Sequence, residues 1–468
     1  MDRMGDMATA LPMSPEGAPA AARVARWRRR SVAVVVGLVL ADSSVVILAL
    51  PAIYREFGAQ VTNVAWVLTA FNLALAASAV PAAALVPRIG AERLCALGLT
   101  AFGAASLACA LAPSLGVLIG ARAVQGVAGA AAVCAALELL PTVAGGEKKA
   151  ARSWAAAGVV GAALGPAIGG LLTETFSWQT IFICQVPLAI APIGLIGLRG
   201  TRARPERAGR PHLAANAALA LLSAGLTAAL FLLVLLLIEG WRLSPLAAAA
   251  VVSVLPAASI LTGPFEGRVG QVRTRVAAGA IVGAGGLAAL GLMPRPGWWW
   301  TVPAQVLVGV GLALALGGLT DAALAGRSRV ALHGGVTIAS RHAGIVLGLL
   351  LLTPVFVGDL DRQRARAEQR GVALVLDSRI APTTKLALAD VLAVDLRREP
   401  GRLPDIQASF AKVNPRASDR AEFEALATHL DDQLDRAATS SFSRSFLVAA
   451  LLALLGLIPV AMSREVRL

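Results

Sequence analysis

The sequence predicts an all-α membrane protein with twelve transmembrane helices. Of its 468 residues, 57% are hydrophobic and only 15% are charged, and the mean hydropathy is +0.72. Apolar runs of about 20 residues recur along the chain, and a helix of that length can cross the roughly 30 Å hydrocarbon core of a bilayer. The runs lack the strict alternation typical of a transmembrane β-barrel, so helices are expected.

The predicted spans follow one another through short connections, except that a long polar segment precedes the last one. Each span is an apolar run bounded by charged, glycine-rich or proline-rich sequence. In chain order the spans are 31–53, 63–86, 92–112, 115–140, 151–173, 178–198, 213–238, 244–264, 276–293, 299–322, 331–357 and 443–463.

Arginine and lysine gather in alternate loops, and cytoplasmic loops are the ones that carry an excess of these residues. The short loops of the opposite side hold only Arg55, Arg242 and Arg295. Because the number of spans is even, both termini are expected in the cytoplasm, and the chain is expected to be a multi-pass protein of the inner (plasma) membrane. The basic stretches assigned to the cytoplasmic side are 23–30, 87–93, 146–152, 199–210, 267–275, 326–329 and 463–467.

The composition also excludes several classes of function. The net charge of +14 is mostly explained by the loop bias, and without a compact basic domain no nucleic-acid partner is expected. The four cysteines lie in predicted spans, and neither they nor the four histidines have the spacing of metal ligands. The phosphate-binding sequence G-x-x-x-x-G-K-[ST] is absent. We therefore expect no metal, no other cofactor and no enzymatic activity.

Two similar halves are indicated by weak repeats. The sequence R-[IV]-G-x-x-R begins at Arg88 and again at Arg268, 180 residues later. Arg122 and Gln305 are 183 residues apart, and each is followed by a glycine four residues on. We expect a six-plus-six duplication. The domains are then 1–30, a disordered basic cytoplasmic tail; 31–198, an N-terminal six-helix bundle; 199–212, a cytoplasmic linker; and 213–468, a C-terminal six-helix bundle.

The segment 358–442 does not fit a membrane span, because acidic and basic residues are mixed throughout it. The predicted topology places it outside the cytoplasm as an insertion in the second bundle, and long loops are exempt from the positive-inside bias. Several of its stretches have helical periodicity, so we expect a small helical cap. Two interpretations stay open: a tolerated insertion, or a receptor or binding domain.

The stretch GVVGAALGPAIGG, residues 158–170, concentrates glycine in an apolar span. Gly161, Gly165 and Gly169 are spaced by four and share one helix face, Gly170 lies beside them, and Pro166 is expected to bend the helix. Small residues let helices approach closely in lipid, where apolar burial drives little association. The stripe predicts either an ordinary packing seam or a smooth face at an interface that moves.

Ionisable residues within the spans need a reason, because each costs about 2.5–3.5 kcal/mol at the centre of a bilayer. Asp42 lies roughly 18 Å along a helix from Arg30, at a rise of 1.5 Å per residue, which is near the midplane. It is either a proton-coupling carboxylate or a structural one. Arg122 lies roughly 10 Å inside its span by the same rise and would pair with Asp42, bond backbone carbonyl groups or face water.

Four other polar residues of the spans are candidates for a cavity lining or a gate: Asn72, Gln305, Arg341 and His342. Histidine titrates near neutral pH, so His342 is either a second proton site or a packing residue.

Several segments resemble motifs of the drug/proton antiporters of the major facilitator superfamily. Residues 161–170, G-x-x-x-G-P-x-x-G-G, resemble the antiporter motif of the fifth helix, and 118–130, LIGARAVQGVAGA, resemble the motif of the fourth, with Arg122 at the arginine position. Residues 40–53 resemble the first-helix motif, with Asp42 as its acid. Further resemblance lies in WVLTAFNLALA (66–76), SWQTIFICQVP (177–187) and SRHAGIVLG (340–348).

The resemblance implies the major facilitator fold, a proton-coupling role for Asp42 and Arg122, and a structural or gating role for Arg341. It also implies gating loops at Arg88 and Gly90 and, by the repeat, at Arg268 and Gly270. The loop motif departs from the family pattern, since Pro87 stands where the family has aspartate. Many similar exporters have fourteen helices, whereas twelve are predicted here.

The predicted function is secondary active transport, in which protons drive export of a small lipophilic or drug-like molecule by alternating access. The expected partners are that small molecule, protons and the lipid bilayer, and the chain is expected to act as a monomer. Two alternatives stay open. One is proton-coupled uptake of a metabolite, and the other is a membrane sensor or assembly protein that acts through 358–442.

Overall fold

The computed structural model describes residues 17–144, 146–197, 209–324, 330–398 and 406–463. Within these ranges the chain consists of helices and short connections, and no strand occurs. The helices are α1 (Gly17–Ile47), α2 (Leu50–Glu56), α3 (Val61–Ile89), α4 (Ala91–Ala110), α5 (Leu115–Ala144), α6 (Glu147–Thr175), α7 (Gln179–Ile190), α8 (Ile193–Ile196), α9 (Leu213–Leu235), α10 (Pro245–Val252), α11 (Val254–Thr262), α12 (Val272–Gly291), α13 (Trp298–Leu324), α14 (Val330–Asp377), α15 (Pro382–Arg398), α16 (Ile406–Ala411), α17 (Arg420–Leu455) and α18 (Leu457–Met462). Three short turns are η1 (Leu236–Gly240, a π-helix), η2 (Gly263–Arg268) and η3 (Ala417–Asp419), the last two 3₁₀-helices.

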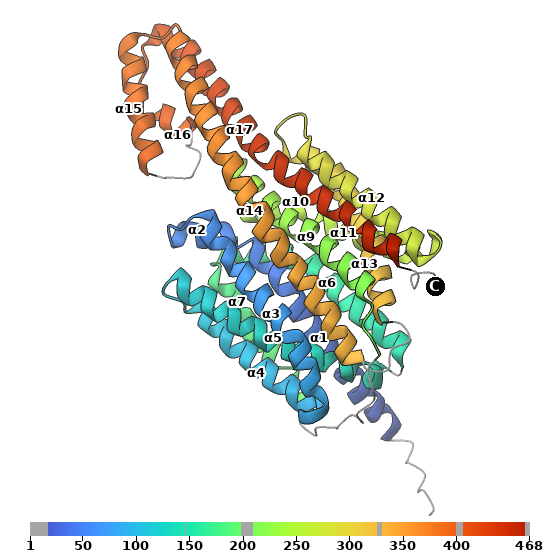
Figure 1. Ribbon diagram of the computed structural model, residues 1–468. Coiled ribbons are helices and arrows are strands. Elements are labelled where there is room, and N and C mark those ends of the chain that lie inside the picture. Colours follow the sequence, from blue (N-terminus) through green and yellow to red (C-terminus); the bar gives the residue numbers. More distant parts are fainter. Residues whose placement is uncertain (1–16, 145, 198–208, 325–329, 399–405, 464–468) are drawn as a thin grey trace, which may run out of the picture.

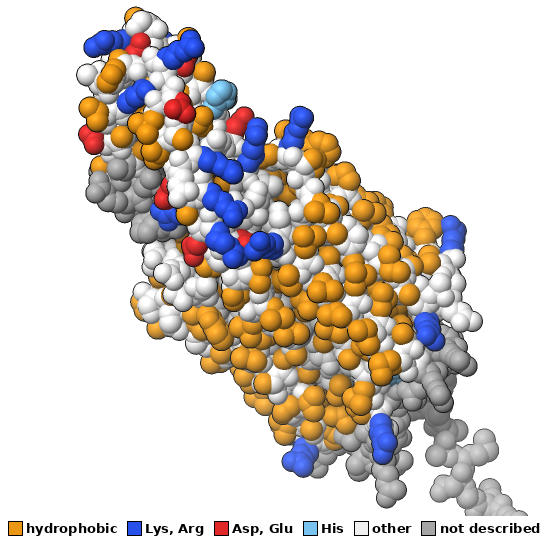
Figure 2. Space-filling view, turned by 45° about the horizontal axis from the view of Figure 1, so that its top comes forward, with side chains coloured by type: hydrophobic (Ala, Val, Ile, Leu, Met, Phe, Trp, Pro, Cys, Tyr) orange, Lys and Arg blue, Asp and Glu red, His pale blue; other side chains and the backbone are white. Residues whose placement is uncertain are grey.

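The prediction of an all-α membrane protein is confirmed. Eleven helices in the described residues are long and apolar enough to cross a membrane, and α6 covers the remaining predicted span, 151–173. Apolar side chains form a broad belt over the face of the bundle shown in Figure 2. Because this apolar surface faces outward rather than into a core, it is suited to contact the hydrocarbon chains of lipids.

Prolines divide four of the predicted spans into two helices each. The break between α1 and α2 precedes Pro51, and the break between α7 and α8 is at Pro192. Two further helices, α11 and α18, begin just before Pro256 and Pro459. A proline lacks the N–H that the helix would need and clashes with the preceding turn, so the break falls at or before it. Each pair nevertheless covers one predicted span.

The first helix is longer than expected. It begins at Gly17, so residues 17–30 are helical, although the sequence predicts a disordered tail over 1–30. This part is rich in alanine and arginine, which are good helix formers, and Arg28 forms an ion pair of 3.3 Å with Glu92 of α4. Residues 1–16, most of the predicted linker 199–212 and the basic loop 326–329 lie outside the described residues.

Glycine contacts recur between corresponding helices of the two halves. A Cβ added to Gly98 of α4 would lie closer than 3.0 Å to the backbone of α5, and one added to Gly279 of α12 would do the same to α13. Gly126 of α5 packs in this way against α3, and Gly309 of α13 against α11. Within each half, the second, third and fourth spans therefore meet through glycines at matching positions. The six-plus-six duplication stays a prediction, and these contacts support it.

The repeated R-[IV]-G sequences form matching turns. Gly90 has φ 95° and Gly270 has φ 88°, in the left-handed region that favours glycine because it has no Cβ. Each turn connects the second and third spans of its half. Arg88 and Arg268 are exposed beside these turns, and Arg268 lies over the ring of Phe265, 4.9 Å from its centroid.

The halves meet mainly along two helix pairs, α14 with α3 and α10 with α6. Gly335 of α14 packs on Ala79 and Ala83 of α3, and Gly170 of α6 packs on Pro245 and Ala249 of α10. Two polar contacts join the halves at the end of the bundle nearest α2 and α10 (Figure 1): Arg55 pairs with Glu239 at 2.8 Å, and the backbone N–H of Leu246 donates to Glu174 at 2.7 Å.

The predicted insertion 358–442 forms a helical hairpin that projects from the bundle (Figure 1). It has a small hydrophobic core that includes Leu388, Phe410, Phe423 and Leu426. No helix begins or ends where the hairpin joins the bundle. The 48-residue helix α14 runs unbroken from the bundle into the hairpin, and the 36-residue helix α17 runs unbroken from the hairpin back into the bundle. We refer to residues 358–442 as the hairpin.

Candidate functional site

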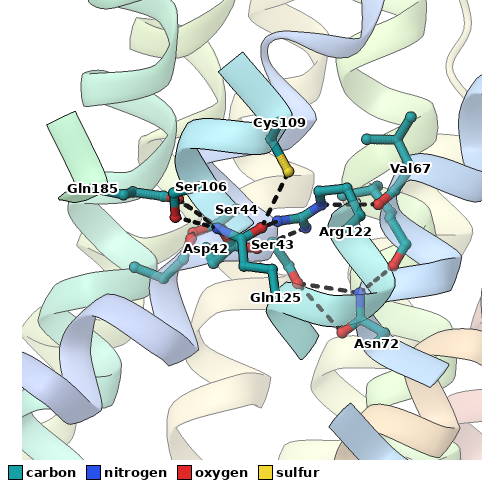
Figure 3. A network of polar contacts seen from close by, with 12 residues as sticks. Asp42, Ser43, Ser44, Val67, Asn72, Ser106, Cys109, Arg122, Gln125 and Gln185 are labelled. Atoms are coloured by element: carbon teal, nitrogen blue, oxygen red, sulfur yellow. Dashed lines mark hydrogen bonds and ion pairs between the residues drawn. The ribbon is translucent and has the colours of Figure 1, made fainter. Parts of the chain in front are cut away.

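The structure joins Asp42 and Arg122 in an ion pair within the N-terminal half (Figure 3). Arg122 Nη2 lies 2.6 Å from Asp42 Oδ2, and both side chains are 0% exposed. The arginine also donates from Nε to the carbonyl oxygen of Val67 at 3.1 Å. Of the three environments that the sequence leaves open for Arg122, the structure shows two together: a carboxylate partner and a backbone carbonyl.

Amide and hydroxyl side chains complete this network. Gln185 donates to Asp42 Oδ1 at 2.8 Å, so the two carboxylate oxygens have different partners. Gln125 accepts from Arg122 and donates to Ser106 at 2.7 Å and to Gln185 at 2.8 Å. The residues come from α1, α4, α5 and α7, and Val67 adds α3. One buried network therefore links five helices of the first half.

Aromatic rings cover the rest of the guanidinium group. Its carbon lies 4.2 Å from the ring centroid of Phe71 and 5.7 Å from that of Phe182. A ring face attracts a cation and keeps water away from it. In such a dry environment the charge of Asp42 matters strongly to Arg122, because removing one partner of a buried pair leaves the other charge uncompensated.

A second chain of contacts leads from this site to the other half. Asn72, on α3, exchanges hydrogen bonds with Ser43, the neighbour of Asp42, at 3.1 and 3.3 Å. Its Oδ1 also lies 2.7 Å from Nδ1 of His342, on α14. Both Asn72 and His342 are buried. A polar connection therefore runs from the residue next to Asp42 to a helix of the C-terminal half.

The glycine stripe of α6 packs mainly on α1. An added Cβ at Gly161 would lie 2.7 Å from the carbonyl oxygen of Gly37, and at Gly165 and Gly169 it would overlap Ser44 and Val45. The stripe therefore lies within the first half, against the turns that carry Asp42. Only Gly170 contacts the other half, and Pro166 lies inside the continuous helix.

The remaining candidates lie apart from the ion pair. Gln305 is fully buried on α13 and donates to Thr301 of its own helix at 3.0 Å, whereas Arg122 at the matching position contacts α1 and α3. Arg341 is half-buried next to His342 on α14.

Sequence reasoning did not single out Gln125, Gln185 and Ser106 as partners of the pair. A glutamine inside an apolar span is the pattern that could have pointed to them, because a buried amide needs hydrogen-bond partners. Gln185 lies within 177–187, a segment whose resemblance to the family is noted above, but no motif connects Gln185 with Asp42.

Comparison with known proteins gives relatives among resistance proteins. The chain is 35% identical over 190 residues to the multidrug efflux pump LfrA of Mycolicibacterium smegmatis, which covers 39% of this chain and 38% of that protein. It is 37% identical over 172 residues to the methyl viologen resistance protein SmvA of Salmonella typhimurium, 36% of this chain and 34% of that one. It is 38% identical over 178 residues to the puromycin resistance protein pur8 of Streptomyces alboniger, 37% and 34%. The matches thus span little more than a third of each relative.

A solved structure shares the fold over most of the chain. It is a bacterial homologue of the human lysosomal transporter Spinster, inward-facing and unoccupied, with a TM-score of 0.61 and 15% identity, and it covers 94% of this chain and 98% of that one. The model of the Major Facilitator Superfamily matches residues 32–351. This is a family of multi-pass membrane transporters rather than enzymes, which agrees with the eleven candidate spans. The chain belongs to the Major Facilitator Superfamily.

Proposed function

We propose that the chain is an inner-membrane secondary transporter that exports small lipophilic or drug-like molecules in exchange for protons, by alternating access, with both termini in the cytoplasm. The observation that carries the proposal is the fully buried pair of Asp42 and Arg122. Three relatives named for efflux or resistance support the direction of transport.

The geometry suggests how one proton would change the site. In the ionised state Asp42 holds Arg122 with Oδ2 and accepts from Gln185 with Oδ1. Protonation removes the negative charge and leaves the guanidinium with Val67, Gln125 and the aromatic rings. Because the network links five helices, loss of this attraction favours a different packing of the first half. A proton that moves inward releases roughly 2.3 kcal/mol per 100 mV.

The proposal is tested in everted membrane vesicles that contain the full chain. Methyl viologen and puromycin, taken from the names of two relatives, head the panel of compounds. Export in the cell corresponds to accumulation in everted vesicles, so we expect accumulation that needs an imposed pH gradient, acidic inside, and that a protonophore abolishes. Depletion driven by the gradient would support uptake instead. Accumulation that persists with the protonophore would exclude proton coupling.

Replacing His342 by leucine is expected to lower transport several-fold. The substitution removes the hydrogen bond that joins Asn72 to the other half, while Asn72 keeps its bonds with Ser43. One hydrogen bond is worth about 0.5–1.5 kcal/mol. Because this bond is present in one arrangement of the two halves, its loss shifts the equilibrium between that arrangement and the others. The measurement is the initial rate at a fixed pH gradient. His429→Leu, an exposed histidine of the hairpin, is the control, and equal rates for the two variants would exclude a role for the bond.

A further inference from the structure

A small hollow lies where the hairpin leaves the bundle. Its volume is about 50 Å³, and it is lined by residues of α14 and α17. Three of these residues are arginines and one is an aspartate, so the lining has an excess of positive charge. The lining residues are Asp359, Arg362, Gln363, Arg366, Ser440 and Arg444.

Asp359 forms ion pairs with two of the three arginines that line the hollow. Its side chain is 7% exposed, and its Oδ1 pairs with Arg362 and, at 3.3 Å, with Arg444 of the other helix. One carboxylate therefore holds two guanidinium groups, whose side chains are still 57% and 67% exposed. Arg366 is exposed and forms no ion pair within the described residues. Several N–H groups of the hollow are thus left for an anionic ligand, and guanidinium groups match the oxygens of a phosphate well.

The hollow lies at the border of the apolar belt. Figure 2 shows Lys and Arg side chains gathered between the belt and the projecting hairpin. Leu351 precedes Arg362 by eleven residues and Leu451 follows Arg444 by seven, so at 3.6 residues per turn each leucine lies within about 20° of its arginine around the helix. Both leucines are exposed, 43% and 54%. The cationic hollow therefore continues along both helices into a lipid-facing apolar surface.

We propose that this hollow binds the phosphate diester of an anionic phospholipid, whose acyl chains lie along the leucine faces of α14 and α17. The excess positive charge favours an anionic headgroup over a zwitterionic one, whose own cation would meet the arginines. The adjoining apolar surface favours a lipid over free phosphate. The inference rests on the membrane embedding of the chain and on the hollow, and it does not depend on proton coupling or on the direction of transport.

Native mass spectrometry of the purified full chain tests this proposal. The protein is exposed to phosphatidylglycerol, to phosphatidylcholine or to inorganic phosphate, and the retained molecules are counted. We expect wild type to retain phosphatidylglycerol in preference to the other two. Arg366→Gln, which breaks no ion pair, should reduce retention about threefold, and Arg366→Gln with Arg444→Gln about tenfold. The control, Arg416→Gln with Arg420→Gln, removes two exposed arginines elsewhere in the hairpin and should retain the lipid.

Three results would overturn the proposal. Equal retention of phosphatidylcholine would mean that the headgroup charge is not recognised. Retention of inorganic phosphate as strong as that of phosphatidylglycerol would identify a free-anion site. Equal losses in the double variant and in its control would mean that lipid is held by overall charge and not by the hollow.

Discussion

Asp42→Asn is expected to abolish proton-driven accumulation in everted vesicles, with a loss of at least about a hundredfold. The asparagine side chain has nearly the same shape, and its oxygen can still accept from Gln185, which bonds Asp42 Oδ1 in the wild type. It carries no exchangeable charge, however, so the imposed gradient has no group to act on at this position. The measurement is the initial rate of accumulation with and without the gradient.

The substitution also leaves the buried guanidinium of Arg122 without its counter-charge. Breaking a buried ion pair from one side costs about 3–5 kcal/mol, so the variant should unfold more easily in detergent. Asp42→Asn combined with Arg122→Gln removes both charges and is expected to recover much of this stability, yet no proton coupling. The double variant therefore separates folding from function.

Asp390→Asn is the matched control for this experiment. Asp390 is an exposed aspartate of the hairpin, and the change removes the same charge without touching the site. It should transport and unfold as the wild type does. Gradient-driven accumulation that survived in Asp42→Asn at the wild-type rate would show that another group accepts the proton.

Gly169→Ala is expected to separate α1 from α6 and to impair transport strongly. A Cβ at this position would overlap the backbone carbonyl of Val45, and a backbone group cannot rotate away as a side chain can. Overpacking of this kind costs about 1–3 kcal/mol. Since Val45 lies one turn from Asp42, the displacement also disturbs the ion pair. Thermal unfolding in detergent and the transport rate measure the two effects.

Gly120→Ala provides the control for the glycine stripe. Gly120 lies in α5, and an added Cβ there would meet nothing within 4 Å. Alanine is also the better helix former by about 1 kcal/mol in a helix interior, so this variant should be as stable as the wild type or slightly more. If both glycine variants behaved alike, close contact between α1 and α6 would not be what the stripe provides.

The fold could be predicted because lipid imposes simple requirements on a sequence. Long apolar runs must be helices, and arginines must keep to one side, so the spans were predicted closely even where Pro51, Pro192 and Pro256 divide them. The pair of Asp42 and Arg122 could be anticipated for the same reason. A charge in lipid needs a partner, and few candidates exist.

The remaining contacts depend on three-dimensional proximity that spacing does not reveal. Gln185 is 143 residues from Asp42. An uncharged amide in an apolar span costs less free energy than a charge does, so the sequence alone does not require a specific partner for it. His342 and Asn72 lie in different halves, 270 residues apart. The glycine stripe at 161–170 predicts that another helix packs closely on this face, but it does not predict which helix, because a face of small residues can accommodate many different helices. The structure assigns most of it to α1.

Because α14 is one continuous helix, the position of the hairpin depends on the tilt of α14 within the bundle. The same helix touches α3 at Gly335, holds Asn72 through His342 and runs on to Asp377 without interruption, in spite of Pro354. The distance from His342 to Asp377 along the axis is about 52 Å at 1.5 Å per residue. A tilt of about 5° at the level of His342 therefore swings the far end by roughly 4–5 Å. A tilt of α14 too small to detect beside Asn72 would therefore be easier to detect at the hairpin, where a probe can be attached.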